Sequence, residues 1–186
     1  TMQDALREHV TVPASNLAIK PNGISWEQAG SLATPGLTAQ ACIDFMQPGP
    51  SDIVFLSAAA GSVGALYAQI AITRGARVIG SASSSNADYL RSLGVIPVDY
   101  EGDLAEQVAQ HAPNGVTMMQ DNWGREAIDF GLALGLKPEK ICTIVDHAAT
   151  AQLGLSNPGQ YARNPSTLRA LAEQIAEGSM SFPIEH

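Results

Sequence analysis

Two hydrophobic patterns take turns along this chain: short apolar runs, and apolar residues repeated at helical spacing. Ile53 to Leu56 is a short apolar run, which predicts a strand buried on both faces. Val63, Leu66 and Ile70 then recur at helical spacing, with alanines between them that let a helix lie close on a sheet. This stretch predicts a strand, a turn of small residues and a helix in direct succession.

The two patterns continue to alternate towards the C-terminus. Helices are expected at 87–93, 104–110, 126–134 and 168–175. Strands are expected at 77–79, 95–98, 116–119 and 141–145, and a last one begins at 182–184. Strands that alternate with helices indicate an α/β protein with a doubly wound parallel sheet, the Rossmann fold.

Two further helices are expected before the first strand. Ser25 and the glutamine three residues later have the spacing of a capping box, which predicts a helix that ends near Leu32. Thr34 is a suitable N-cap with Pro35 at the first helical position, and predicts a second helix that runs towards Met46.

The outer segments of the chain have less regular patterns. Residues 1–24 hold short extended pieces without a core of their own, so we expect a tail and linker there and the folded domain at 25–186. The segment 146–166 is rich in Ala, Gly, Asn and Pro, and is expected to be loose.

Composition narrows the class of protein. The chain has 186 residues and a formal net charge of −8, and its acids are spread along the sequence. This charge argues against nucleic-acid and anionic-membrane partners. No apolar run approaches the length of a membrane span, and no signal peptide opens the chain. We therefore expect a soluble protein without nucleic-acid or membrane partners.

Cysteine and histidine positions carry no metal-binding pattern. Cys42 and Cys142 lie far apart and form no C-x-x-C pair, which fits a reducing compartment, so a cytoplasmic location is expected. His9, His111 and His186 share no metal-ligand spacing with one another or with the cysteines. No metal site is expected.

The turn after the first strand has the spacing of a dinucleotide-binding motif. Gly61 would let the backbone approach a pyrophosphate, and Gly64 would let the helix pack closely on the strand. The position of the first motif glycine is taken by Ala59. On spacing alone, a plain small-residue turn into a helix explains the stretch equally well.

The end of the second expected strand bears on the choice of cofactor. An acid there would bind the ribose hydroxyls of NAD, but the first acid is Asp88, inside the next helix. The serines after this strand and Asn86 suit a 2′-phosphate better, which favours NADP (NADPH). The alternative is a serine-rich loop in which Ser85 or Asn86 caps the following helix.

Two other side chains follow expected strands. His147 with the neighbouring Asp146 could donate a proton, but we favour a surface loop histidine. Asp121 is interpreted as a cap for the turn at Trp123 and Gly124. The tryptophans are scattered along the sequence and are interpreted as packing or rim residues.

Four stretches together resemble a known family. They are Gly36-Leu37-Thr38-Ala39, Ala58-Ala59-Ala60-Gly61-Ser62-Val63-Gly64, Asn86 to Gly94, and Val98-Asp99-Tyr100. In this order, they are similar to the cofactor-binding domain of the medium-chain dehydrogenase/reductase superfamily, and within it to the zinc-independent, NADPH-dependent quinone oxidoreductase branch. The resemblance runs from about residue 8 to the end.

The resemblance implies a set of cofactor-binding residues. They are Ala60, Gly61, Ser62, Val63 and Gly64 at the pyrophosphate, Thr38 near the nicotinamide, Ser83, Ser84, Asn86 and Tyr100 around the adenosine and its 2′-phosphate, and Asn122 facing the cofactor cleft. Pro35 stands where zinc-dependent relatives carry a cysteine ligand, which implies a zinc-independent protein.

The resemblance also implies a larger parent protein. Members of this branch carry an N-terminal barrel-like catalytic domain, so we expect this chain to be a fragment that lacks it and is inactive in isolation. The parent would transfer hydride from NADPH to a quinone, an enone or a similar polarised double bond, and its acceptor-polarising residues are expected outside this chain. A homodimer is one assembly that the resemblance allows.

Two other functions remain open at this point. One is a non-catalytic dinucleotide-sensing or partner-docking module on the same scaffold. The other is a methyltransferase that uses the sheet for S-adenosylmethionine, although the glycine turn fits a pyrophosphate better.

Overall fold

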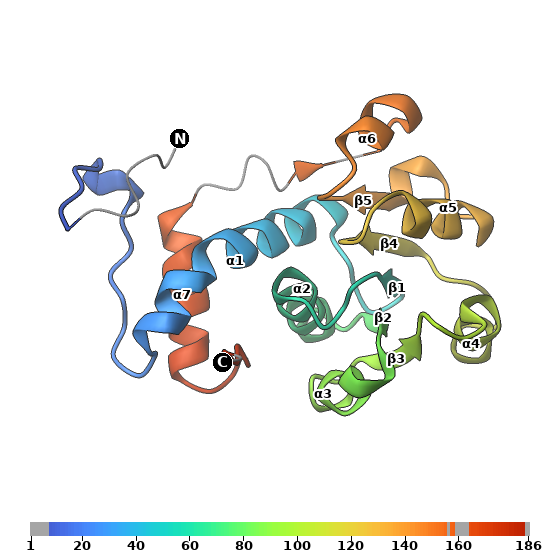
Figure 1. Ribbon diagram of the computed structural model, residues 1–186, viewed down its shortest axis with the longest axis horizontal. Coiled ribbons are helices and arrows are strands. Elements are labelled where there is room, and N and C mark those ends of the chain that lie inside the picture. The colour runs from blue at the N-terminus through green and yellow to red at the C-terminus, as the bar shows by residue number, and fades with distance from the viewer. Residues whose placement is uncertain (1–7, 156, 159–163, 185–186) are drawn as a thin grey trace.

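The computed structural model describes residues 8–155, 157–158 and 164–184. Among these residues, five parallel strands form one sheet in the order β3-β2-β1-β4-β5 (Figure 1). The strands are β1 (Ile53–Leu56), β2 (Arg77–Ala82), β3 (Ile96–Asp99), β4 (Met118–Asp121) and β5 (Ile141–Thr143). From the central β1 the chain first builds outward through β2 and β3, and then returns to build β4 and β5 on the other side. The predicted doubly wound parallel sheet is confirmed.

Helices cover both faces of the sheet. They are α1 (Trp26–Met46), α2 (Ser62–Thr73), α3 (Ala87–Ser92), α4 (Leu104–His111), α5 (Arg125–Ala133), α6 (His147–Leu153) and α7 (Pro165–Ala176), with short 3₁₀ turns η1 (Ala14–Asn16), η2 (Ser84–Asn86) and η3 (Pro138–Lys140). Successive side chains of a strand point to opposite faces, so Val54 and Leu56 enter one core and Phe55 the other.

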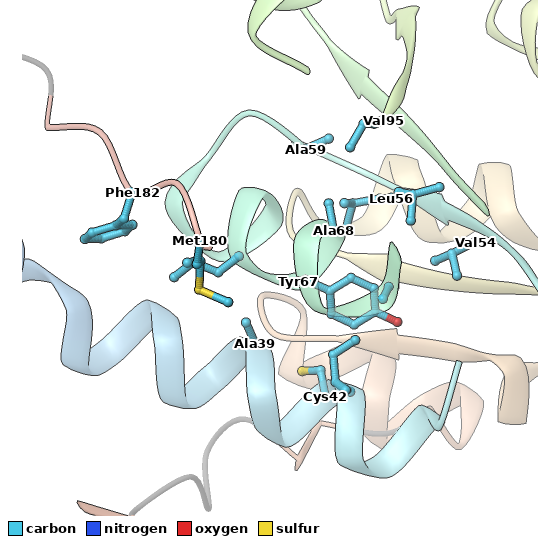
Figure 2. Close-up of a cluster of buried hydrophobic side chains, with 14 of the residues drawn as sticks. Ala39, Cys42, Val54, Leu56, Ala59, Tyr67, Ala68, Val95, Met180 and Phe182 are labelled. Carbon is cyan, nitrogen blue, oxygen red and sulfur yellow. The ribbon is translucent and has the colours of Figure 1, made fainter. Parts of the chain in front are cut away.

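Each face of the sheet has its own hydrophobic core, and each core contains a different set of helices. Val54 and Leu56 pack with residues of α1, α2, α3 and α7, and Figure 2 shows part of this cluster around Tyr67 of α2. On the opposite face, Phe55 and Met119 pack with residues of α4, α5 and α6. The central strand β1 is therefore buried on both sides, as its continuous apolar sequence predicts.

The expected break at Pro35 is wrong. Helix α1 starts with the predicted capping box at Ser25, but continues through Pro35 to Met46 without a second N-cap at Thr34. An interior proline costs a helix about 3 kcal/mol. Both halves are nevertheless buried, with Leu32 and Cys42 in the same core, so packing against α2 and α7 stabilises one continuous helix.

Two expectations near the C-terminus are also wrong. Residues 182–184 form no strand, because Phe182 is buried in the α1 and α2 core and its carbonyl accepts from Gln28 Nε2 at 2.9 Å. The segment expected to be loose begins with α6, whose N-cap Asp146 accepts from Ala149 N at 2.8 Å. Residues 156 and 159–163 of this segment, and His186, lie outside the described residues. The division of the chain at residue 24 stays a prediction.

A pair of buried thiols lies between α1 and β5. Cys42 and Cys142 are both fully buried. The hydrogen bond with Cys42 and then burial raise the pKa of the Cys142 thiol above its ordinary value. Its folded pKa therefore exceeds its unfolded pKa, so this group stabilises the fold fully below about pH 8.5 and progressively less as the pH rises further.

We expect both thiols to be unreactive in the folded chain. Ellman's reagent should label Cys42 and Cys142 at least about 100-fold more slowly in buffer than in denaturing urea, because the reactive thiolate forms only after opening. Absorbance of the released thiol measures both rates. Fast labelling of either thiol in buffer would contradict the burial described above.

Candidate functional site

The turn between β1 and α2 is tied to the neighbouring strand. Ala59 N donates to Ser81 O of β2 at 2.9 Å, and Gly61 N donates to Ala58 O at 3.1 Å. Ala58 has a φ of +46°, an uncommon conformation for a residue with a side chain. The turn lies at the C-terminal end of the central strand, where the strand order reverses and α/β sheets bind ligands.

The two glycines of this turn have different surroundings. A Cβ on Gly64 would lie 2.6 Å from Ala58 O and 2.8 Å from Ala59 O, so only glycine fits the contact between α2 and the turn. A Cβ on Gly61 would have only Ala58 O within 4 Å, at 3.3 Å. Gly61 is exposed, and so is Ser62 at the start of α2. Backbone N–H groups at this helix N-terminus are therefore open to an anion.

A mostly apolar cavity of about 430 Å³ adjoins the turn. It opens at the C-terminal ends of β1 and β2, between α4 and α5. Its lining residues are Phe55, Ser57, Ala58, Ser81, Ala82, Tyr100, Leu104, Trp123, Glu126, Ala127 and Phe130. Flat rings line its walls, so the cavity suits a flat aromatic ligand group.

A smaller and more polar cavity of about 200 Å³ lies beyond the end of β2. It is lined by Ser83 and Ser84 together with Arg91 of α3 and Asp99 of β3. Asn86 Nδ2 donates to Ser83 Oγ at 2.9 Å, so the asparagine bonds the serine rather than capping α3. Ala82 lines both cavities, which places them side by side.

Asp121 connects the ends of three strands. Its Oδ1 accepts from Ser57 Oγ at 2.8 Å, Trp123 N at 2.9 Å and Gly124 N at 3.0 Å, and its Oδ2 accepts from Thr143 Oγ1 at 2.8 Å. The residue is fully buried. The predicted cap for the turn at Trp123 and Gly124 is confirmed, and the same carboxylate also fixes β1 to β5.

Known proteins resemble this chain in sequence. The chain is 34% identical over 138 residues to the human synaptic vesicle membrane protein VAT-1 homolog, which covers 71% of this chain. It is 33% identical over 119 residues to the NADPH-dependent curcumin reductase of Escherichia coli, which covers 61% of this chain. It spans 34% of the length of each. No protein-family model matches the chain.

The structure resembles those of known oxidoreductases. The quinone oxidoreductase of Coxiella burnetii superposes with a TM-score of 0.75 and 26% identity, over 89% of this chain and 54% of that one. The quinone oxidoreductase of Pseudomonas syringae gives a TM-score of 0.72, also at 26% identity, over 93% of this chain and 60% of that one. The chain belongs to the medium-chain dehydrogenase/reductase superfamily. Its relatives and structural neighbours are of the zinc-independent quinone oxidoreductase and enoyl reductase type within that superfamily, as its motifs predict.

Most of the residues assigned through the superfamily resemblance gather at one end of the sheet. Ala60 to Gly64 form the turn and the start of α2, Ser83 and Ser84 line the polar cavity, and Tyr100 lines the apolar one. Asn122 is held beside them, because its Nδ2 donates to Ser57 O at 3.0 Å and its Oδ1 accepts from Gln120 Nε2. The cofactor-binding roles of these residues stay predictions.

Thr38 is placed apart from this group. It is half-buried in the middle of α1 and lines neither of the two cavities. His147, the candidate proton donor, is exposed at the start of α6, and its Nδ1 lies 3.0 Å from Nδ2 of the buried Asn157. Among the residues that the structure describes, no group of three or more His, Cys, Asp or Glu side chains could hold a metal ion.

Two residues of the site were missed at the sequence level. Trp123 was interpreted as a packing or rim residue; it is 66% exposed, which fits a rim residue, but its place in the wall of the apolar cavity was not predicted. Its position two residues after the end of β4 is a signal that could have found it. Arg91 lies outside the serine-rich stretch, and only the fold of α3 onto β3 brings it to Ser83 and Ser84.

Within the described ranges, no helix is long and apolar enough to cross a membrane.

Proposed function

We propose that the chain is the NADPH-binding domain of a zinc-independent oxidoreductase that transfers hydride to a quinone, an enone or a similar polarised double bond. The observation that carries this proposal is the turn at Gly61 and Gly64, which presents an uncapped helix N-terminus at the reversal point of a parallel sheet. Relatives named as an NADPH-dependent reductase and as quinone oxidoreductases support it.

The residues present fit a dinucleotide. Gly61 and the exposed start of α2 would hold the pyrophosphate, because no side chain covers the N–H groups there. The apolar cavity would take the adenine between Trp123 and the rings of Tyr100 and Phe130. When bound, the cofactor supplies the hydride, and the chain's part is to bind and orient it.

The other end of the cofactor would lie over β4 and β5. In a sheet of this order a dinucleotide crosses the strand ends from one half to the other, so the ring opposite the adenine reaches the ends of these two strands. Asn122 and the Asp121 network make this edge rigid through bonds to Ser57 and Thr143. A rigid edge keeps the ring in one orientation for transfer.

We expect NADPH to bind this chain and Gly61→Leu to weaken that binding at least about 10-fold. Gly61 has φ −68° and ψ 162°, which leucine adopts freely, so the variant should fold while its side chain covers the phosphate site. Calorimetric titration with NADPH measures the affinity. Gly30→Leu is the matched control, because Gly30 is exposed in α1 and no atom lies within 4 Å of the position that a Cβ would take.

Two results would contradict the proposal. Failure of the unaltered chain to bind either NADPH or NADH would favour the non-catalytic scaffold, and displacement of the nucleotide by S-adenosylmethionine would favour a methyltransferase. Reduction of quinones and enones by the protein that carries this domain then tests the activity. The cytoplasmic location and the homodimer stay predictions.

A further inference from the structure

We propose that Arg91 is the residue that recognises the 2′-phosphate of the cofactor and sets the preference for NADPH over NADH. This inference rests on the proposed function. It starts from the polar cavity beyond β2, where Arg91 of α3 lines the same space as the serines Ser83 and Ser84. A guanidinium and two hydroxyl groups around one cavity are the donors that a phosphate requires.

Charge makes Arg91 distinctive within the site. Among the residues that line the two cavities, Arg91 carries the sole positive charge, and the other charged residues are Asp99 and Glu126. Only Arg91 can therefore attract a dianionic group into this space. Without it, a phosphate would enter a cavity whose other charged residue, Asp99, repels it.

Asp99, the acidic residue of the same cavity, forms hydrogen bonds with residues close to it in sequence. Its Oδ1 accepts from Glu101 N at 3.0 Å, and its backbone is bracketed by the side-chain amide of Gln107. Ser83 Oγ accepts from Asn86 Nδ2 at 2.9 Å and lies 2.9 Å from Ser85 Oγ. The hydroxyl cluster at the rim is thus ordered by its own hydrogen bonds, next to the guanidinium.

The Arg91 guanidinium forms one exposed ion pair, with Asp88, and can still bind a ligand. Its Nη1 donates to Asp88 Oδ1 at 2.6 Å, one turn back on α3, and the two side chains are 60% and 97% exposed. Water competes strongly with such an exposed pair, so it holds Arg91 only weakly. The remaining N–H groups of the guanidinium stay available for a bidentate bond to phosphate.

The experiment compares ligands that differ by one phosphate. Titrations of the whole chain with NADPH, NADH, adenosine 2′,5′-bisphosphate and AMP give four affinities at equal salt. We expect the two phosphorylated ligands to bind more tightly than their partners. Arg91→Gln should weaken those two about 10-fold and leave NADH and AMP within about 2-fold. Asp88→Asn should instead strengthen NADPH binding about 2-fold, since it frees the guanidinium.

Arg169→Gln is the matched control. Arg169 is also an exposed arginine in a helix, with 62% of its side chain accessible, and pairs with Glu173 at 2.8 Å on α7, which lies apart from α3 in Figure 1. It should change none of the four affinities. Equal loss of NADPH and NADH in Arg91→Gln, or equal affinity of the unaltered chain for both, would overturn the inference while the proposed function stands. Binding of none of the four ligands would overturn both.

Discussion

Replacing Gly64 with alanine is expected to destabilise the chain by about 3 kcal/mol, near the upper end for an overpacked core position. The new Cβ would lie 2.6 Å from Ala58 O, 2.8 Å from Ala59 O and 2.9 Å from Ala59 Cα. All three are backbone atoms of a turn that is bonded to β2, so they cannot move aside as a flexible side chain can. Urea unfolding followed by circular dichroism measures the change.

Gly30→Ala provides the comparison for this prediction. Gly30 lies in the same chain's first long helix, α1, with no atom within 4 Å of an added Cβ. Alanine should stabilise it by up to about 1 kcal/mol through helix propensity. A loss at Gly64 no larger than about 0.5 kcal/mol would show that the turn yields, and that glycine is not needed there for packing.

Removing the Asp121 carboxylate is the second change with a large expected effect. Asp121→Ala should cost roughly 4 kcal/mol, because the donors of the buried Ser57, Gly124 and Thr143 lose their acceptor together with the backbone N–H of the exposed Trp123. Asp121→Asn should cost about 2 kcal/mol, since its oxygen can keep the three bonds of Oδ1, whereas the Thr143 hydroxyl loses its acceptor and already accepts from Val145 N and Asp146 N. Denaturant unfolding of both variants checks the order.

Asp129→Asn is the control for charge removal alone. Asp129 forms an exposed ion pair with Arg125 at 2.9 Å within α5, and its loss should cost no more than about 0.5 kcal/mol. If Asp121→Ala destabilised the chain as little as this control does, water would have to replace the carboxylate as the hydrogen-bond acceptor. The three strand ends would then be joined by backbone pairing rather than by the side chain of Asp121.

Local signals were sufficient for the sheet and for the glycine turn. The apolar run of β1 and the small residues after it depend on near neighbours in sequence, and the structure places β1 at the predicted residues. The Asp121 cap could also be predicted, because its N–H partners lie two and three residues away. Its bonds to Ser57 and Thr143 could not, since they join residues that are 64 and 22 positions away.

The failures share one cause, which is packing between distant segments. Pro35 has the local context of a helix start, but contacts of α1 with α2 and α7 override it. Phe182 has the local pattern of a strand, but its side chain is buried in the core beside α1. Likewise, Trp123 and Arg91 enter the site only because the sheet brings the ends of β2, β3 and β4 to one edge. No window of neighbouring residues contains that information.

The contact of α1 with the end of the chain has a consequence for synthesis on the ribosome. Gln28 bonds to Phe182 across 154 residues, and a Cβ on Gly36 would lie 3.0 Å from Leu171 of α7. Helix α1 emerges from the exit tunnel before the sheet and its neighbour α2, but its other partner α7 emerges after every strand of the sheet. The part of its apolar stripe that packs on α7 therefore stays uncovered until the end of the domain has been translated, and this is where a nascent chain would need a chaperone.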